Sequence, residues 1–249
     1  MSKISRKAVI TGSSKGIGKA IAERFAQENI DVYLLASNEA NLKQTTSELK
    51  NKYNVNVYYH ASDLKTKPGC ESAIEAVKDE FTDFDTLVFS AGATKSGNFL
   101  EQPIEDFEDG FALKFYSAVR LSKAFWPTLS RNKGWVVSIN GAMSHSPDPF
   151  FMVGGAVNAA FLNFSKALSK KGLIDGVNVN SINPGMTSTD RLITIIQNNA
   201  DREGISFAEA EQKALNNIGL DRFGTPEEVA ELTYFLCNPK MRHLTGTEI

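Results

Sequence analysis

The sequence lacks several features that would direct it to particular classes of protein. No run of about 18 apolar residues occurs, so no membrane-spanning helix is expected. The opening residues, MSKISRKAVITG, contain no apolar signal core. The formal net charge of −2 argues against the basic surface that nucleic acids or anionic membranes require. We therefore expect a cytoplasmic protein with neither nucleic-acid nor membrane partners.

Cysteine and histidine are also scarce. The two cysteines, Cys70 and Cys237, fall in helix-like segments far apart in the chain. Free buried thiols in a reducing compartment are therefore expected, not a disulfide framework. The histidines, His60, His145 and His243, are scattered, so no metal site is expected.

The order of apolar segments predicts the fold class. Short apolar runs alternate with longer amphipathic segments, a pattern typical of a parallel sheet with helices on both faces. No linker or repeat interrupts residues 1–249, so we predict one Rossmann-type doubly wound α/β domain of about six or seven strands, with its ligand crevice at the carboxyl ends of the strands. The expected strands are 7–11, 31–35, 54–60, 86–89, 134–139 and 177–182; the expected helices are 18–27, 39–50, 70–81, 104–129 and 153–171.

Two later segments have a different character. Residues 186–220 are polar and helix-prone, which favours a lid over the crevice. Its apolar side chains suggest an apolar or amphipathic ligand; they are Ile193, Ile195, Ile196 and Phe207. Residues 244–249, LTGTEI, begin what could be a seventh strand.

A glycine-rich turn joins the first expected strand to the first helix. It reads Thr11-Gly12-Ser13-Ser14-Lys15-Gly16-Ile17-Gly18. Glycines allow the backbone to turn sharply and to approach a pyrophosphate, which the helix N-terminus then faces. Because the turn lies between a strand and a helix of a βαβ array, it predicts a dinucleotide site.

Several ordered motifs resemble the short-chain dehydrogenases/reductases along essentially the whole chain. The turn matches the family's TGxxxGxG, Ser90-Ala91-Gly92 resembles its NAG turn, the segment 183–189 is similar to its PG motif and threonine, and 221–230 is close to its RxGxPEEVA segment. The resemblance implies that a nicotinamide dinucleotide binds Gly12, Ser14, Lys15, Gly16, Ile17, Gly18, Ser37, Asp63, Leu64, Ser90, Ala91, Gly92, Pro184, Gly185, Thr187 and Thr189.

The charge of nearby side chains predicts whether the cofactor carries a phosphate on its ribose 2′ oxygen. An acidic residue at the end of the second strand would bind the ribose diol and repel a 2′-phosphate. That end reads Leu34-Leu35-Ala36-Ser37-Asn38, without an acid, and Lys15 supplies positive charge. The arginine of many NADP-preferring relatives is replaced by Ser37. We expect NADP(H) to be preferred over NAD(H); the alternative for Lys15 is a solvated surface side chain.

The residues that carry the family's chemistry are missing. The family's Tyr donates a proton, a Lys four residues later lowers the Tyr pKa, a Ser binds the carbonyl, and an Asn completes a proton path. Here those positions fall on Gly154, Asn158, Gly141 and Lys114, respectively. A shifted alignment does not restore the tyrosine, because none lies between Tyr116 and Tyr234 and no Y-x-x-x-K occurs. Losing one factor of about 10³ would raise the barrier by roughly 4 kcal/mol.

Possible substitutes leave alternatives open. His145, in the loop after the fifth strand, is either a general acid or a solvent-facing histidine. Lys114 either pairs with the nicotinamide ribose or substrate, or lies at the surface or in packing. The glycines at 154 and 155 predict a loose or displaced first helical turn.

Three functions remain open. The first is a cofactor-binding partner subunit or scaffold that is inactive as an ordinary carbonyl reductase. The second is an NADP(H)-dependent oxidoreductase, or a non-redox enzyme, with altered chemistry. The third is a structural protein that binds no nucleotide. The resemblance implies a homodimer or homotetramer, with Phe161, Leu162 and Phe164 at a helical interface, or assembly with a catalytic relative; the chain stops at Ile249, before the family's final DGG, so it is naturally short or truncated.

Overall fold

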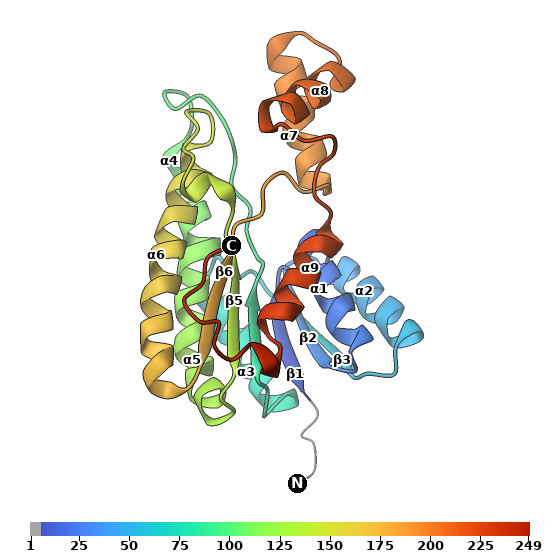
Figure 1. The fold of residues 1–249 in the computed structure, drawn as a ribbon, viewed down its shortest axis with the longest axis vertical. Coiled ribbons are helices and arrows are strands. Elements are labelled where there is room, and N and C mark those ends of the chain that lie inside the picture. The colour runs from blue at the N-terminus through green and yellow to red at the C-terminus, as the bar shows by residue number, and fades with distance from the viewer. Residues whose placement is uncertain (1–5) are drawn as a thin grey trace.

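A single parallel sheet forms the centre of the computed structural model, which describes residues 6–249 (Figure 1). Its order is β3-β2-β1-β4-β5-β6. The strands are β1 (Lys7–Thr11), β2 (Asp31–Ala36), β3 (Val57–Ala61), β4 (Thr86–Phe89), β5 (Trp135–Ile139) and β6 (Asn178–Ile182). The predicted fold class, a doubly wound Rossmann-type sheet, is confirmed.

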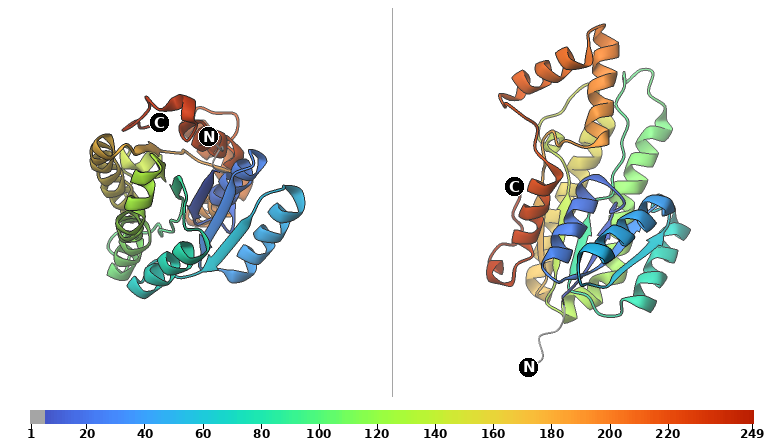
Figure 2. Two further views of the ribbon diagram at one scale, coloured as in Figure 1. Left: turned by 90° about the horizontal axis from the view of Figure 1, so that it is seen from below. Right: turned by 90° about the vertical axis from the view of Figure 1, so that its right-hand side faces the viewer.

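Helices cover both faces of this sheet (Figure 2). One core contains residues of α1 (Gly16–Gln27), α2 (Glu39–Lys52) and α9 (Pro226–Leu236) together with Ala8 and Ile10 of β1. The other contains residues of α3 (Lys67–Glu80), α5 (Ser117–Arg131) and α6 (Met152–Asp175) together with Val9. Because successive strand side chains point to opposite faces, the run Ala8-Val9-Ile10 supplies both cores. Such burial on both faces explains why the strands read as continuous apolar runs.

Some predicted boundaries are wrong. The third strand begins at Val57, not at residue 54, because residues 53–55 form a bend; the Asn56 amide after this bend donates to Asp31 Oδ1 at 2.9 Å. The helix predicted over 104–129 consists of α4 (Ile104–Gly110), a π-helical segment η1 (Phe111–Tyr116) and α5. Tyr116, for which the aromatic surroundings suggest packing, is 51% exposed.

The predicted seventh strand is reduced to a short pairing. Ser181 and Glu248 form an isolated parallel bridge, flanked by a hydrogen bond of 2.9 Å from the Ser181 amide to the Thr247 carbonyl. A turn at Gly246, whose φ is +68°, precedes this pairing, and the Gly246 amide donates to the Val179 carbonyl at 2.7 Å.

The first turn of α6 is regular, so the predicted loosening is wrong. The helix begins at Met152, and the Gly155 amide donates to the Phe151 carbonyl at 2.9 Å. Phe161 is 1% exposed and packs its ring against Phe89, at 5.9 Å between centroids. It belongs to the core and not to an exposed interface, contrary to the expectation for this residue.

Two helices extend beyond the carboxyl ends of the strands (Figure 1). They are α7 (Asp190–Glu203) and α8 (Phe207–Ile218), and they share a small apolar core of their own. Thr189 caps α7, and Ser206 with Glu209 forms a capping box on α8. Within residues 6–249, no helix is long and apolar enough to span a bilayer.

Candidate functional site

The glycine-rich turn between β1 and α1 is shaped by close backbone contacts. Gly12 has φ +66°, and a Cβ there would lie 2.7 Å from the Ala91 backbone. A Cβ on Gly18 would lie 2.2 Å from the Gly12 carbonyl oxygen. Glycine is therefore required at both positions, and the turn packs directly on the segment after β4. Thr11 Oγ1 joins the two by accepting from the amides of Ser90 and Ala91 at 3.1 Å.

The N-terminus of α1 is left open for an anion. Lys15, its N-cap residue, makes no side-chain capping bond, and the first turn contains no acidic side chain. The positive end of the helix dipole is therefore free to face a phosphate. Lys15 Nζ lies 3.6 Å from Asp190 Oδ2 of α7, an exposed ion pair across the mouth of the site.

The end of β2 carries no acid. Asn38 caps α2 by accepting from the Asn41 amide at 2.9 Å, whereas Ser37 lines the space beside the turn. Asp63 Oδ1 accepts from the Lys65 amide at 3.0 Å, which orients this carboxylate after β3. A ribose 2′ substituent is expected near Ser37 and Lys15. These two side chains are neutral and basic, respectively.

These elements line one crevice of about 740 Å³ at the carboxyl ends of the strands. A volume of this size suits a dinucleotide and a small ligand. The lining includes all the predicted cofactor residues except Pro184, Gly185 and Thr187, which the structure does not bring to the crevice wall. Asp106 and Asp109 of α4 also line it and were not anticipated. None of the six tyrosines lines it. Within residues 6–249, no cluster of potential metal ligands occurs.

Lys114 and Asn158 meet at the inner wall of the crevice. Lys114 Nζ donates to Asn158 Oδ1 at 2.6 Å and to the Asn140 carbonyl at 2.5 Å. The lysine is only 9% exposed, which overturns the surface role considered for it. Burial, with the nearby Arg191 guanidinium as a second cause, lowers the pKa of Lys114 to about 7. The π-helical segment η1 carries this side chain, and such segments recur at functional sites.

Gly141 lies where the family's serine is expected. Its φ of +144° favours glycine, and a Cβ there would lie 2.8 Å from Asn158 Nδ2. A serine side chain would therefore meet both backbone strain and the Asn158 amide. The glycine at 141 and the asparagine at 158 are matched to each other.

Gly154 lies where the family's tyrosine is expected. The ring of Phe151 lies beside this glycine. A Cβ at Gly154 would lie 1.9 Å from Cε1 of Phe151. The Phe151 ring thus fills the space that a tyrosine at 154 would enter. No hydroxyl reaches the crevice from this part of α6.

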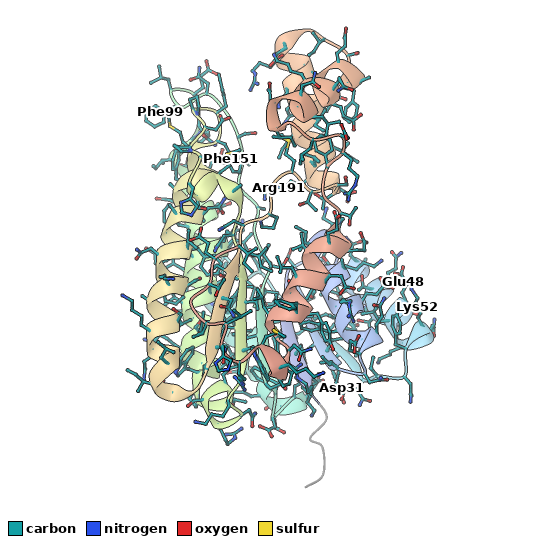
Figure 3. All side chains as sticks on the ribbon, viewed as in Figure 1. Asp31, Glu48, Lys52, Phe99, Phe151 and Arg191 are labelled. Carbon is teal, nitrogen blue, oxygen red and sulfur yellow. The ribbon has the colours of Figure 1, made fainter. Side chains whose placement is uncertain are left out.

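Arg191 of α7 crosses toward the segment after β4. Its guanidinium donates to Thr94 Oγ1 at 2.9 Å, to the Thr94 carbonyl at 3.2 Å and to the Gly92 carbonyl at 3.3 Å. It lies 5.8 Å from the Phe151 ring, and Figure 3 shows both residues on the facing sides of this end of the molecule. The arginine was not anticipated, because nothing in its sequence context marks it.

His145 is directed away from this arrangement. Its Nε2 contacts Glu248 Oε1, which also accepts from Asn183 Nδ2 at 2.7 Å. Its side chain is 61% exposed and does not line the crevice. The structure therefore places the candidate substitute acid in a contact with the C-terminal segment.

Comparisons with known proteins agree with this architecture. A model of the family described as short chain dehydrogenase matches residues 6–200. The chain belongs to this family. It is 27% identical over 242 residues to the 3-oxoacyl-[acyl-carrier-protein] reductase FabG of Aquifex aeolicus, covering 97% of this chain and 93% of that protein.

Two solved structures have closely similar folds. L-sorbose reductase of Gluconobacter frateurii, complexed with NADPH and L-sorbose, superimposes with a TM-score of 0.92 at 30% identity, covering 98% of this chain and 94% of that one. An NADPH-bound short-chain oxidoreductase of Pseudomonas aeruginosa PAO1, described as containing an atypical catalytic center, gives 0.87 at 25% identity, covering 98% and 94%.

The sequence did not reveal the contact between Lys114 and Asn158. A signal was present, because the resemblance aligns the family's Asn with Lys114 and its Lys with Asn158, an exchange of residue type between two positions. An exchange between two positions suggests that they touch. The sequence contains no comparable signal for Phe151, whose ring position depends on packing.

Proposed function

We propose that this chain binds NADP(H) and lacks the tyrosine-dependent carbonyl reduction typical of its family, acting as a cofactor-binding partner subunit or scaffold. The observation that carries the proposal is the coexistence of an open nucleotide crevice with a Phe151 ring at the tyrosine position. The turn at Gly12–Gly18, the open α1 N-terminus and Thr189 supply the contacts that a pyrophosphate and nicotinamide would need.

The preference for NADP(H) over NAD(H) rests on charge. Ser37 offers a hydroxyl where an acid would repel a 2′-phosphate, and Lys15 lies on the same side of the crevice. Several relatives are described as NADPH-bound or NADPH-dependent, which supports the same choice, although one similar structure is complexed with NADH.

Assembly forms part of the proposal. A homodimer or homotetramer, or a pair with a catalytic relative, would give a cofactor-binding subunit its role. The α7–α8 segment would serve as the lid over the crevice, since Lys15–Asp190 and Arg191–Thr94 already link α7 to its rim.

A second candidate is an NADP(H)-dependent oxidoreductase with altered chemistry. The buried Lys114 amine favours this second candidate. It is a titratable group with a pKa of about 7, and it lines the crevice near the place expected for the nicotinamide. The Pseudomonas relative described as having an atypical catalytic center supports the idea that the fold accepts a different set of groups.

The proposal is tested with a panel of aldehydes and ketones and with NADPH oxidation as the readout. The Aquifex reductase serves as the active control, assayed on its own 3-oxoacyl substrate. Loss of a positioned general acid predicts rates for this chain at least about 100-fold below the control. Rates equal to the control on any carbonyl would overturn the proposal.

A further inference from the structure

The Lys114 amine is held in a fixed place at the inner end of the crevice. Two of its three N–H groups donate to oxygens from different elements: the Asn140 carbonyl at the end of β5, and Asn158 Oδ1 on α6. The side chain lines the crevice, and its Cδ would lie 3.4 Å from a Cβ on Gly92. One N–H therefore remains for a group that enters from the crevice.

The chemistry of this place is unusual for lysine. The oxygens that hold the amine are neutral, and neither α6 nor β5 contributes a carboxylate to it. Four acids line the crevice, and all are engaged elsewhere: Asp106 with Lys95 at 2.7 Å, Asp109 with Lys65 at 3.0 Å, Asp190 with Lys15 at 3.6 Å, and Asp63 with the Lys65 amide at 3.0 Å. The charge that most affects the amine is Arg191, which destabilises the ammonium form.

We propose that Lys114 is the catalytic acid of a carbonyl reduction, replacing the tyrosine. The inference rests on the proposed cofactor site and takes the second candidate function in place of the scaffold role. A wild type that binds NADPH but transfers no deuterium would leave the scaffold role standing. NADPH, when bound, supplies the hydrogen and two electrons that form the new C–H bond of an aldehyde or ketone. As the carbonyl π bond breaks, the Lys114 N–H bond breaks and its proton forms the O–H bond of the alcohol. The neutral amine then regains a proton from solvent.

Asn158 and Asn140 position this acid. An amide oxygen and a backbone carbonyl accept from the ammonium without stabilising its charge as strongly as a carboxylate partner would, so they do not raise the pKa of the amine as a carboxylate does. Their two bonds orient the remaining N–H. The pKa of Lys114, lowered to about 7 by burial, makes the ammonium a much better donor than an ordinary lysine and matches the acid to a neutral medium. Reduction should therefore slow as pH rises through about 7.

The test uses the full-length protein and NADPH carrying deuterium at nicotinamide C4. Single turnovers with protein in excess are run on an aliphatic aldehyde, a methyl ketone and a 3-oxo thioester, and deuterium in the alcohol is measured by mass spectrometry. The variants are Lys114→Met, which removes the acid, and Lys114→Arg, which keeps the charge but donates no proton near pH 7. Lys123→Met, an exposed lysine of α5, is the matched control.

The expected result is deuterium transfer by wild type that declines above about pH 7, with a loss of at least about 100-fold in both Lys114 variants and none in Lys123→Met. NADPH affinity, measured by calorimetry for every variant, should stay unchanged. Transfer by Lys114→Met at the wild-type rate, full activity of Lys114→Arg, or no transfer by an NADPH-binding wild type would each overturn the inference alone. Failure of wild type to bind NADPH would overturn the proposed cofactor site as well.

Discussion

At the residue scale, the main feature of the crevice is the pair Lys114 and Asn158, which lie on two different helices. The resemblance predicts an amide at the position of Lys114 and an amine at the position of Asn158, the reverse of the side chains present. In the structure these two side chains are joined at 2.6 Å. The exchange preserves both chemical groups at one junction. The residues around it are adjusted to match: Gly141 leaves room for the Asn158 amide, and Phe151 covers Gly154.

The buried amine makes the stability of the unliganded protein depend on pH. The folded-state pKa of Lys114, about 7, lies below the ordinary lysine value of 10.5, so the unfolded chain binds more protons between these values. The free energy of unfolding of wild type, relative to Lys114→Met, should therefore rise with pH from about 7 to 10, by up to about 1.4 kcal/mol per pH unit. Below pH 7 the difference should be flat.

Urea denaturation of both proteins at several pH values measures this difference. Lys123→Met should show no such trend, since that lysine is exposed. Parallel curves for wild type and Lys114→Met across the whole range would mean that the amine titrates as an ordinary lysine.

At the element scale, the start of α6 pairs a glycine with an aromatic ring: the Phe151 ring occupies the space beside Gly154. Replacing a helical glycine by alanine ordinarily stabilises a protein by about 1 kcal/mol. At Gly154 the new Cβ would meet the Phe151 ring, so overpacking of about 1–3 kcal/mol should outweigh this gain. Gly154→Ala should therefore lower the stability of wild type.

The Phe151→Ala background isolates the cause. There the ring is absent, and Gly154→Ala should become neutral or stabilising. Thermal denaturation of the four proteins gives the coupling between the two positions. An equal effect of Gly154→Ala in both backgrounds would show that the ring does not occupy the space at 154.

The π-helical segment is a second element-scale feature. Within the long helical stretch preceding β5, η1 interrupts the α-helical hydrogen bonding at Phe111–Tyr116, and it carries Lys114, which lines the crevice. Periodicity alone predicted one uninterrupted helix, because a single π turn hardly disturbs an amphipathic pattern. The segment that periodicity did not reveal carries the buried amine of the site, since Lys114 is 9% exposed.

At the scale of the whole molecule, the sequence predicted the architecture well and the site in part. The alternation of buried strands with amphipathic helices was enough for the sheet, since β1, β2, β4 and β5 are buried on both faces. The glycine turn was predictable because backbone contacts, such as Gly12 with Ala91, allow no other residue. By contrast, the positions of Phe151 and Arg191 depend on contacts between segments distant in the chain, which no local pattern records.

At this scale one property underlies every proposed role of the protein: a nucleotide crevice that binds NADP(H) in preference to NAD(H). Calorimetric titration of the purified protein with NADPH and with NADH tests it without a substrate. The account predicts micromolar binding of NADPH, weaker binding of NADH, and a reduced difference in Lys15→Met, which removes the positive charge beside the turn. Absence of heat with either nucleotide at concentrations well above micromolar would contradict it and leave the glycine turn without a ligand.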